Sequence, residues 1–324
     1  MFDEQDNSGK KDSTAMQQDV IQNLLMASIK EQRRQRRWGI FFKSLMFLYL
    51  FMIFFTFFPG DGADKASLSH GKHTALIDID GVIAANKDAN ADSIIQGLRA
   101  AFEDKNTAGI ILRINSPGGS PVQAGYVYDE IKRLRNIYPD TKVYAVITDI
   151  CASGGYYIAS AADEIYADKA SMVGSIGVLM NGFGFTQAMK KLGIQRRLYT
   201  AGEHKGFLDP FSPENPEEVE FAKGLLKKIH EQFIDVVKEG RGDRLKNDPR
   251  LFTGLIWTGE ESVEMGLVDG LGSSSYVARD VIGAKKIVDY TPKPNYLERF
   301  AERLGVAMAN EVGATISGGQ MHLR

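Results

Sequence analysis

Apolar and polar positions follow two different patterns along the chain. Short β-branched runs predict buried strands, and longer segments with apolar residues every three to four positions predict helices. Strands and helices alternate, which predicts an α/β domain with a mainly parallel sheet covered by helices. The expected strands are 74–83 (broken by a turn), 109–114, 142–150, 164–167, 172–180 and 195–200, and the expected helices are 92–102, 122–136, 156–162, 185–192, 216–240 and 260–265.

Helix ends are signalled by a few residue types. Asp92 or Ser93 is expected to cap the helix over 92–102, and Pro121 suits the first turn of the helix that follows. A further amphipathic helix is expected over 297–308, available for subunit contact.

The amino-terminal region has a different pattern. Four arginines lie within 33–37, and 38–58 is an almost unbroken apolar run whose one charge is Lys43. Roughly 20 apolar residues span a hydrocarbon core of about 30 Å. A buried core helix is disfavoured because the run is apolar on every face, and a cleavable signal peptide because no small-x-small site follows Phe58. We expect an uncleaved transmembrane helix with its amino terminus in the cytoplasm.

These boundaries divide the chain into five parts. We expect a cytoplasmic tail (1–37), an anchor (38–58), a linker (59–71), a folded α/β domain (72–290) and a carboxy-terminal helix with a mobile tail (291–324). The topology that follows is a single-pass membrane protein in which everything after Pro59 lies across the membrane from the cytoplasm.

Composition narrows the function mainly by exclusion. The 324 residues carry a net charge of -2, which does not favour nucleic-acid binding. The single cysteine, Cys151, excludes an internal disulfide, and no HExxH or CxxC motif indicates zinc. No GxGxxG follows the first strand, so a dinucleotide site is not expected. We expect no cofactor and no metal.

The most informative stretch joins an expected strand to an expected helix at Ser153. The apolar run ending at Ile150 gives way to small residues, and Ser153 is followed by Gly154 and Gly155. Such a junction leaves backbone N–H groups free and places the serine on a turn. The serine is either the N-cap of the helix, which is the commoner role, or a nucleophile.

Acyl transfer also needs oxyanion donors and a base. Gly118 and Gly119 end a neighbouring strand, and in a parallel sheet both strand ends reach the same edge, so their N–H groups and that of Gly154 are available to one crevice. His204 and Lys205 are both candidate bases. The residues alone do not choose between them, and each is equally compatible with an exposed loop.

Four motifs in one order resemble the signal peptide peptidase A family, the membrane-anchored bacterial Ser–Lys peptidases related to the Clp protease and crotonase folds. The resemblance covers roughly 72–272 and implies repeated ββα units. It also implies a homo-oligomer, an octamer in the short form, in which the serine of one subunit is served by the lysine of its neighbour. The motifs are Asn115–Gly119, Ala152–Tyr157, Gly174–Val178 and Gly202–Lys205.

Each residue role follows from this resemblance. Ser153 matches the nucleophile, Lys205 the general base and Ser175 the residue that orients the lysine, whereas Gly118 matches the oxyanion turn, with the backbone at Gly154 nearby. His204 is then a neighbour of the base. The implied function is a serine endopeptidase that degrades signal-peptide remnants left in the membrane and, as a second class of substrate, misfolded exported proteins. The resemblance also implies a location in the bacterial inner (cell) membrane, with the catalytic domain periplasmic or otherwise extracytoplasmic.

Two other functions are compatible with the same fold. One is a catalytically silent membrane scaffold, against which the intact serines and lysine argue; the other is a crotonase-type acyl-CoA enzyme, against which the anchor argues. Simple structural roles are expected for the remaining candidates. Cys151 is expected to pack, Ser116 and Ser120 to cap or turn, Tyr156 and Tyr157 to lie in the core or an interface, and Arg241-Gly242-Asp243 to end a helix.

Overall fold

The computed structural model describes residues 26, 30–53 and 71–292. The chain divides into two compact units, Met1–Ser69 and His70–Arg324. In the first unit, residues 30–53 are helical. In the described part of the chain, no helix combines the length and the hydropathy that crossing a bilayer requires. Predictions for the tail before residue 26, the end of the anchor and the linker (54–70), and 293–324, including the helix over 297–308, lie outside the described residues.

An eight-stranded sheet forms the centre of the second unit. Its order is β6-β5-β3-β2-β1-β8, with β4 pairing both β3 and β7. The pairs are parallel except for β5 with β6, so the sheet is mixed, and the α/β prediction is confirmed. The strands are β1 (His73–Asp80), β2 (Thr107–Ser116), β3 (Val143–Ala152), β4 (Glu164–Ala167), β5 (Met172–Gly174), β6 (Ile256–Thr258), β7 (Gly270–Leu271) and β8 (Ile287–Asp289).

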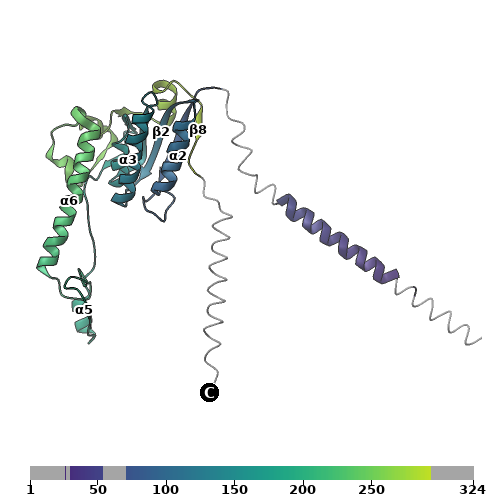
Figure 1. The fold of residues 1–324 in the computed structure, drawn as a ribbon, viewed down its shortest axis with the longest axis horizontal. Helices are drawn as coiled ribbons and strands as arrows, with labels where there is room; N and C mark the ends of the chain where they lie inside the picture. The colour runs from purple at the N-terminus through teal and green to yellow at the C-terminus, as the bar shows by residue number, and fades with distance from the viewer. Residues whose placement is uncertain (1–25, 27–29, 54–70, 293–324) are drawn as a thin grey trace, which may run out of the picture. The chain divides into compact units, whose positions relative to one another are not determined.

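Helices cover the sheet on both faces. The helices α2 and α3 lie side by side over the larger core, which contains Ile77, Leu112 and Ile147 (Figure 1). A smaller core around Ile111 packs under the π-helix η3 on the other face. The helices are α2 (Ala91–Glu103), α3 (Pro121–Ile137), α4 (Gly154–Ala159), α5 (Thr186–Lys191), α6 (Pro216–Arg241), α7 (Gly259–Glu264) and α8 (Ser274–Tyr276), with the short η1 (Gly242–Arg244), η2 (Pro249–Phe252) and η3 (Val277–Val281).

Three expectations about local structure differ from what the structure shows. Asn90 caps α2 by accepting a hydrogen bond from the Ser93 N–H, so neither Asp92 nor Ser93 is the cap. The segment 195–200 forms no strand, because it lies on an extension where no other strand is available to pair with it. The expected strand 172–180 ends early, at Gly174.

The long helix α6 has two different halves. Phe233, Val237 and Arg241 near its end are buried against the domain. Its first half lies away from the sheet, next to α5 (Figure 1). We call residues 178–229 the arm; all of them are described, and only Ala222 among them is buried.

Candidate active site

Ser153 lies at the junction of β3 and α4. Its backbone has φ 51° and ψ -122°, a conformation that costs a non-glycine residue about 1–3 kcal/mol. Its N–H donates to the Gly174 carbonyl at 2.9 Å. Although it occupies the N-cap position, its side chain makes no capping hydrogen bond. The hydroxyl is therefore not engaged as a helix cap, and this strained turn is typical of a nucleophile elbow.

The glycine turn after β2 lies directly against this serine. A Cβ added to Gly118 would meet the Ser153 Cβ at 2.6 Å and the Gly154 nitrogen at 2.7 Å, and Gly118 has φ +99°. A Cβ on Gly119 would lie 2.1 Å from the Ile83 carbonyl oxygen. Only glycine allows this close approach of backbone to nucleophile.

The backbone donors of this turn are not equivalent. The Gly118 N–H donates to the Ser116 hydroxyl at 3.1 Å, and that hydroxyl donates to the Gly81 carbonyl at 2.6 Å. Within the described residues, the N–H groups of Gly119 and Gly154 have no acceptor. The ideal Cβ position of Gly154 is 3.3 Å from the Gly119 nitrogen, so these two donors are close together. A developing oxyanion needs such a pair.

Ser175 is next to the nucleophile across the sheet. Ala152 pairs with Gly174, so the residues that follow them leave neighbouring strands at the same edge. Ser175 has φ 52°, and its N–H donates to the Leu255 carbonyl at 2.7 Å. Ser175 is half-buried at this edge of the sheet.

Lys205 is not brought to Ser153 within one protomer. The segment that carries it is attached to the start of α6, where the Leu208 N–H donates to Glu218 and the Phe207 ring contacts Phe221 with centroids 5.7 Å apart. Further along α6, the His230 Nε2 lies 3.1 Å from the carbonyl oxygen of Ile176, the residue after Ser175. The nine residues from Phe221 to His230 span about 14 Å of helix.

Lys205 and His204 are both exposed side chains of the arm. In the described part of the chain, neither makes a side-chain hydrogen bond or ion pair with Ser153 or Ser175. The structure therefore joins Ser153, Ser175 and the three glycines, and separates Lys205 from them. A general base acts at hydrogen-bond distance, and within one protomer neither candidate base makes such a contact with Ser153.

The other candidates have structural positions. Cys151 is fully buried, and burial raises the pKa of its thiol well above its ordinary range. The buried Tyr156 hydroxyl donates to the Leu267 carbonyl at 2.7 Å. Ser120 caps α3 through the Gln123 N–H. Arg241, the first residue of the Arg-Gly-Asp sequence, is only 1% exposed and ends α6.

Three residues with a role near the site carried no signal in the sequence. Leu255 and Ile176 act through their carbonyls, and His230 binds one of these from α6. Any residue can supply a backbone carbonyl, so the sequence does not mark Leu255 or Ile176. A lone histidine in a helix does not indicate a role by itself.

Comparisons with known proteins identify the family to which the sheet and its helices are similar. The model of peptidase family S49 matches residues 139–287, and that of Clp protease matches 75–173. A Synechocystis protein that carries the name of a protease is 32% identical over 202 residues, which are 62% of this chain and 70% of that protein. Protease 4 of Haemophilus influenzae is 30% identical over 203 residues, 61% of this chain and 32% of that protein.

Higher identity is found to much longer proteins. A Brucella abortus protein named Na(+)/H(+) antiporter NhaA is 45% identical over 210 residues, which are 64% of this chain. The chain spans 28% of the length of that protein. The resemblance inferred from the four motifs is confirmed by the family matches over the sheet and its helices. The chain belongs to peptidase family S49.

Proposed function

We propose that the protein is a serine endopeptidase in which Ser153 is the nucleophile and Lys205 of a neighbouring copy is the general base. The observation that carries this proposal is the uncapped hydroxyl of Ser153, held in a strained turn beside the free N–H groups of Gly119 and Gly154. A peptidase needs that combination, and an N-cap or a silent scaffold does not.

The chemistry follows from these groups. The Ser153 oxygen attacks a peptide carbonyl carbon while its proton passes to the uncharged amine of Lys205. The carbonyl oxygen becomes an oxyanion that the N–H groups of Gly119 and Gly154 stabilise. The lysine returns the proton to the leaving amine, an ester remains on Ser153, and water activated by the same lysine hydrolyses it. Ser175 orients the amine, and the lack of a side chain on Gly118 lets its backbone lie against the nucleophile.

The position of Lys205 favours catalysis between copies. The amine has to be uncharged to accept a proton, and removal from water favours that form. In one protomer, Lys205 lies on the exposed arm, where its amine is neither buried nor close to Ser153. Docking of the arm on a second copy supplies both.

The surface of the arm supports the same assembly. Large exposed apolar side chains are concentrated on it, and monomeric proteins rarely leave so many uncovered. A second copy of this chain covers them, and the family resemblance sets the number at eight. The exposed residues include Leu179, Phe183, Leu192, Ile194, Leu198 and Tyr199.

The substrates and the location form the remaining part of the proposal. The apolar run 38–58 anchors the chain, the arginines of 33–37 keep the amino terminus in the cytoplasm, and the catalytic domain is extracytoplasmic. Signal-peptide remnants, and misfolded exported proteins, are then the accessible peptides. A reporter fused after Ser69 that is active only in the cytoplasm would overturn this orientation.

Mixed oligomers test the catalytic proposal directly. Ser153→Ala and Lys205→Ala are each expected to abolish hydrolysis of an apolar peptide, and a co-assembled mixture of the two is expected to recover part of the activity. Labelling of Ser153 by a serine-directed acylating reagent separates a peptidase from a scaffold. Retained activity in Lys205→Ala together with loss in His204→Ala, or an inactive mixture that assembles normally, contradicts the proposal.

A further inference from the structure

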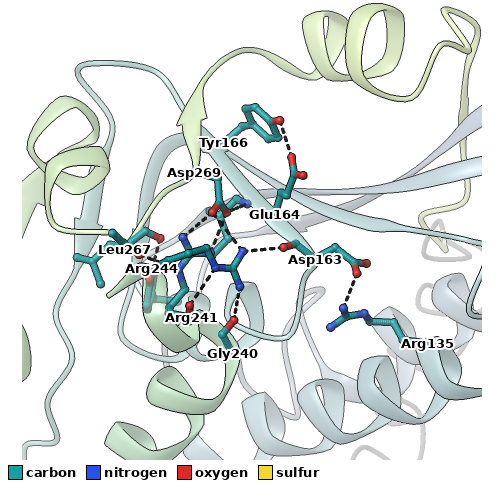
Figure 2. Close-up of polar contacts among 12 residues, drawn as sticks. Arg135, Asp163, Glu164, Tyr166, Gly240, Arg241, Arg244, Leu267 and Asp269 are labelled. Carbon is teal, nitrogen blue, oxygen red and sulfur yellow. Dashed lines mark hydrogen bonds and ion pairs between the residues drawn. The ribbon is translucent and has the colours of Figure 1, made fainter. Parts of the chain in front are cut away.

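The end of α6 is held by a group of charged side chains, centred on the buried Arg241, that the proposed chemistry does not use. We call Arg241, Arg244 and Asp269 the α6 clamp. Arg241 is 1% exposed, and its two terminal nitrogens donate to the two oxygens of Asp269 at 2.8 and 2.9 Å. Its Nε donates to the Gly266 carbonyl at 2.8 Å. Figure 2 shows Arg241 and Asp269 at the centre of this group. The paired geometry fixes the direction of the guanidinium as well as its position.

Asp269 connects this arginine to the sheet. Its carboxylate accepts the Ile165 N–H of β4 at 2.7 Å, and its own N–H donates to the Ile165 carbonyl, also at 2.7 Å. Burial acts to raise the pKa of Asp269, but the hydrogen bonds and charge of Arg241 outweigh it and the net shift is downward. The carboxylate is therefore a charged anchor on β4.

Arg244 holds the last carbonyl groups of α6. Its side chain donates to the Gly240 carbonyl at 2.6 Å, the Arg241 carbonyl at 2.9 Å and the Asp163 carbonyl at 2.9 Å (Figure 2). Carbonyls at a helix end otherwise lack partners. The helix is thereby tied to the loop before β4 as well as to Asp269.

The clamped end of α6 packs on α4, the helix that begins immediately after the nucleophile. A Cβ on Gly240 would lie 2.0 Å from the Ser160 carbonyl oxygen at the end of α4, so no side chain separates the two backbones there. About two helix turns earlier, the centroid of the Phe233 ring lies 5.2 Å from that of the Tyr157 ring. The clamp therefore sets the direction of α6 relative to α4, which begins immediately after Ser153.

The opposite end of α6 carries the segment of Lys205. The contacts of Leu208 with Glu218 and of Phe207 with Phe221 fix that segment to the first turns of the helix. Arg241 is 23 residues from Glu218, which is about 35 Å of helix. A tilt of about 3° at the clamp then moves the Lys205 segment by about 2 Å. Displacements of about 1 Å reduce catalysis by up to about a hundredfold.

We propose that the α6 clamp positions Lys205 for the active site of a neighbouring copy by fixing the direction of the arm. This inference rests on the proposed function. Buried ion pairs add little net stability compared with apolar packing, and orientation is what a paired guanidinium adds here. Arg241, Arg244 and Asp269 are positioning residues, because they touch neither the substrate nor Ser153.

A mixed oligomer distinguishes the arm's role from general stability. Copies with Ser153→Ala donate only Lys205, and copies with Lys205→Ala donate only Ser153. Each clamp substitution, Arg244→Gln or Asp269→Asn, is introduced either into the lysine donors or into the serine donors, never into both. We expect kcat to fall at least tenfold when the clamp is altered in the lysine donors and less than threefold in the serine donors, with KM unchanged. The matched control is Arg279→Gln, which removes an exposed pair with Asp280 and is expected to change neither mixture.

A distance measurement covers the case in which an altered clamp prevents folding of one variant. Spin labels at Lys223→Cys on the arm and Asn136→Cys on α3 report the direction of α6 in oligomers diluted with unlabelled copies. Arg244→Gln, whose side chain is 40% exposed, is expected to broaden the distance distribution. Equal losses of kcat in the two mixtures, or an unchanged distribution, overturn the clamp proposal alone. An inactive parent mixture of Ser153→Ala with Lys205→Ala overturns the proposed function and the clamp proposal together.

Discussion

Gly118→Ala tests whether the glycine turn has to lie against the nucleophile. The added methyl group would be 2.6 Å from the Ser153 Cβ, 2.7 Å from the Gly154 nitrogen and 2.8 Å from the Ala152 carbonyl oxygen. Carbon atoms in contact are normally about 3.5–4.0 Å apart. The turn and the nucleophile therefore have to separate by about 1 Å.

The size of the effect follows from that displacement. A shift of about 1 Å at a reacting group costs up to about a hundredfold in rate. Misplacing the Gly154 N–H adds the loss of an oxyanion donor, which costs about 10²–10³-fold in kcat. At φ +99° alanine is also strained, by about 1–3 kcal/mol. We expect kcat to fall by about 10²–10³-fold and the free energy of unfolding to fall by about 1–3 kcal/mol.

Gly125→Ala is the matched control in α3. A Cβ there meets no atom within 4 Å, so the substitution has space. Replacing a helical glycine with alanine is expected to stabilise the protein by about 0.5–1 kcal/mol and to leave kcat unchanged. Hydrolysis of an apolar fluorogenic peptide gives kcat and KM, and thermal unfolding gives stability. A folded Gly118→Ala oligomer with kcat within threefold of the parent would refute the reasoning, as would an equal loss in Gly125→Ala.

Three further substitutions test separate parts of the domain. A hydrogen bond from Arg133 is the main cause that lowers the pKa of Glu130 from 4.5 to about 2, so this group stabilises the fold fully above pH 4.5 and loses that contribution as the pH falls toward 2. Glu130→Gln is expected to make the free energy of unfolding less dependent on pH between these values. The change is at most about 3 kcal/mol because the arginine partners of Glu130 are half exposed. Denaturant titrations at several pH values measure it, and an unfolding free energy that varies with pH as in the parent speaks against it. Asn90→Ala removes the cap of α2 and is expected to cost about 1 kcal/mol without changing kcat, which chemical unfolding measures; no loss of stability would show that the cap does not form. Tyr156→Phe leaves the Leu267 carbonyl without its donor and is expected to cost about 1–3 kcal/mol at unchanged kcat, and a specific loss of kcat in the folded oligomer would instead assign the tyrosine a catalytic role.

Local patterns were sufficient for much of the fold and for one side of the site. The apolar run before Ser153 and the two glycines after it predicted a strand, a turn and a helix, and these occur as β3, Ser153 and α4. The glycines 118–119 were predicted to lie near this serine because parallel strands end at one edge, and the close approach of Gly118 agrees. Both inferences depend on neighbours in sequence and on the geometry of a parallel sheet.

Features that depend on distant partners were not predicted. The segment 195–200 has the residues of a strand but no strand to pair with, and β6 pairs antiparallel with β5 although nothing in its three residues signals direction. From the residues alone, an N-cap was the commoner role for Ser153, and its backbone angles and hydrogen bonds show that its side chain does not cap α4. Pairing and capping are decided by which groups meet in space.

The sequence by itself determined the kind of chemistry available: a serine at a strand-to-helix junction, glycine turns beside it, and a lysine in a separate motif. Only the tertiary structure decided where these groups lie. It placed Gly119 and Gly154 as the free donors, buried Arg241 against Asp269, and carried the Lys205 segment away on the arm. The physical reason is that residue types and spacing fix local conformation, whereas the direction of a helix such as α6 is fixed by contacts between residues far apart in the chain.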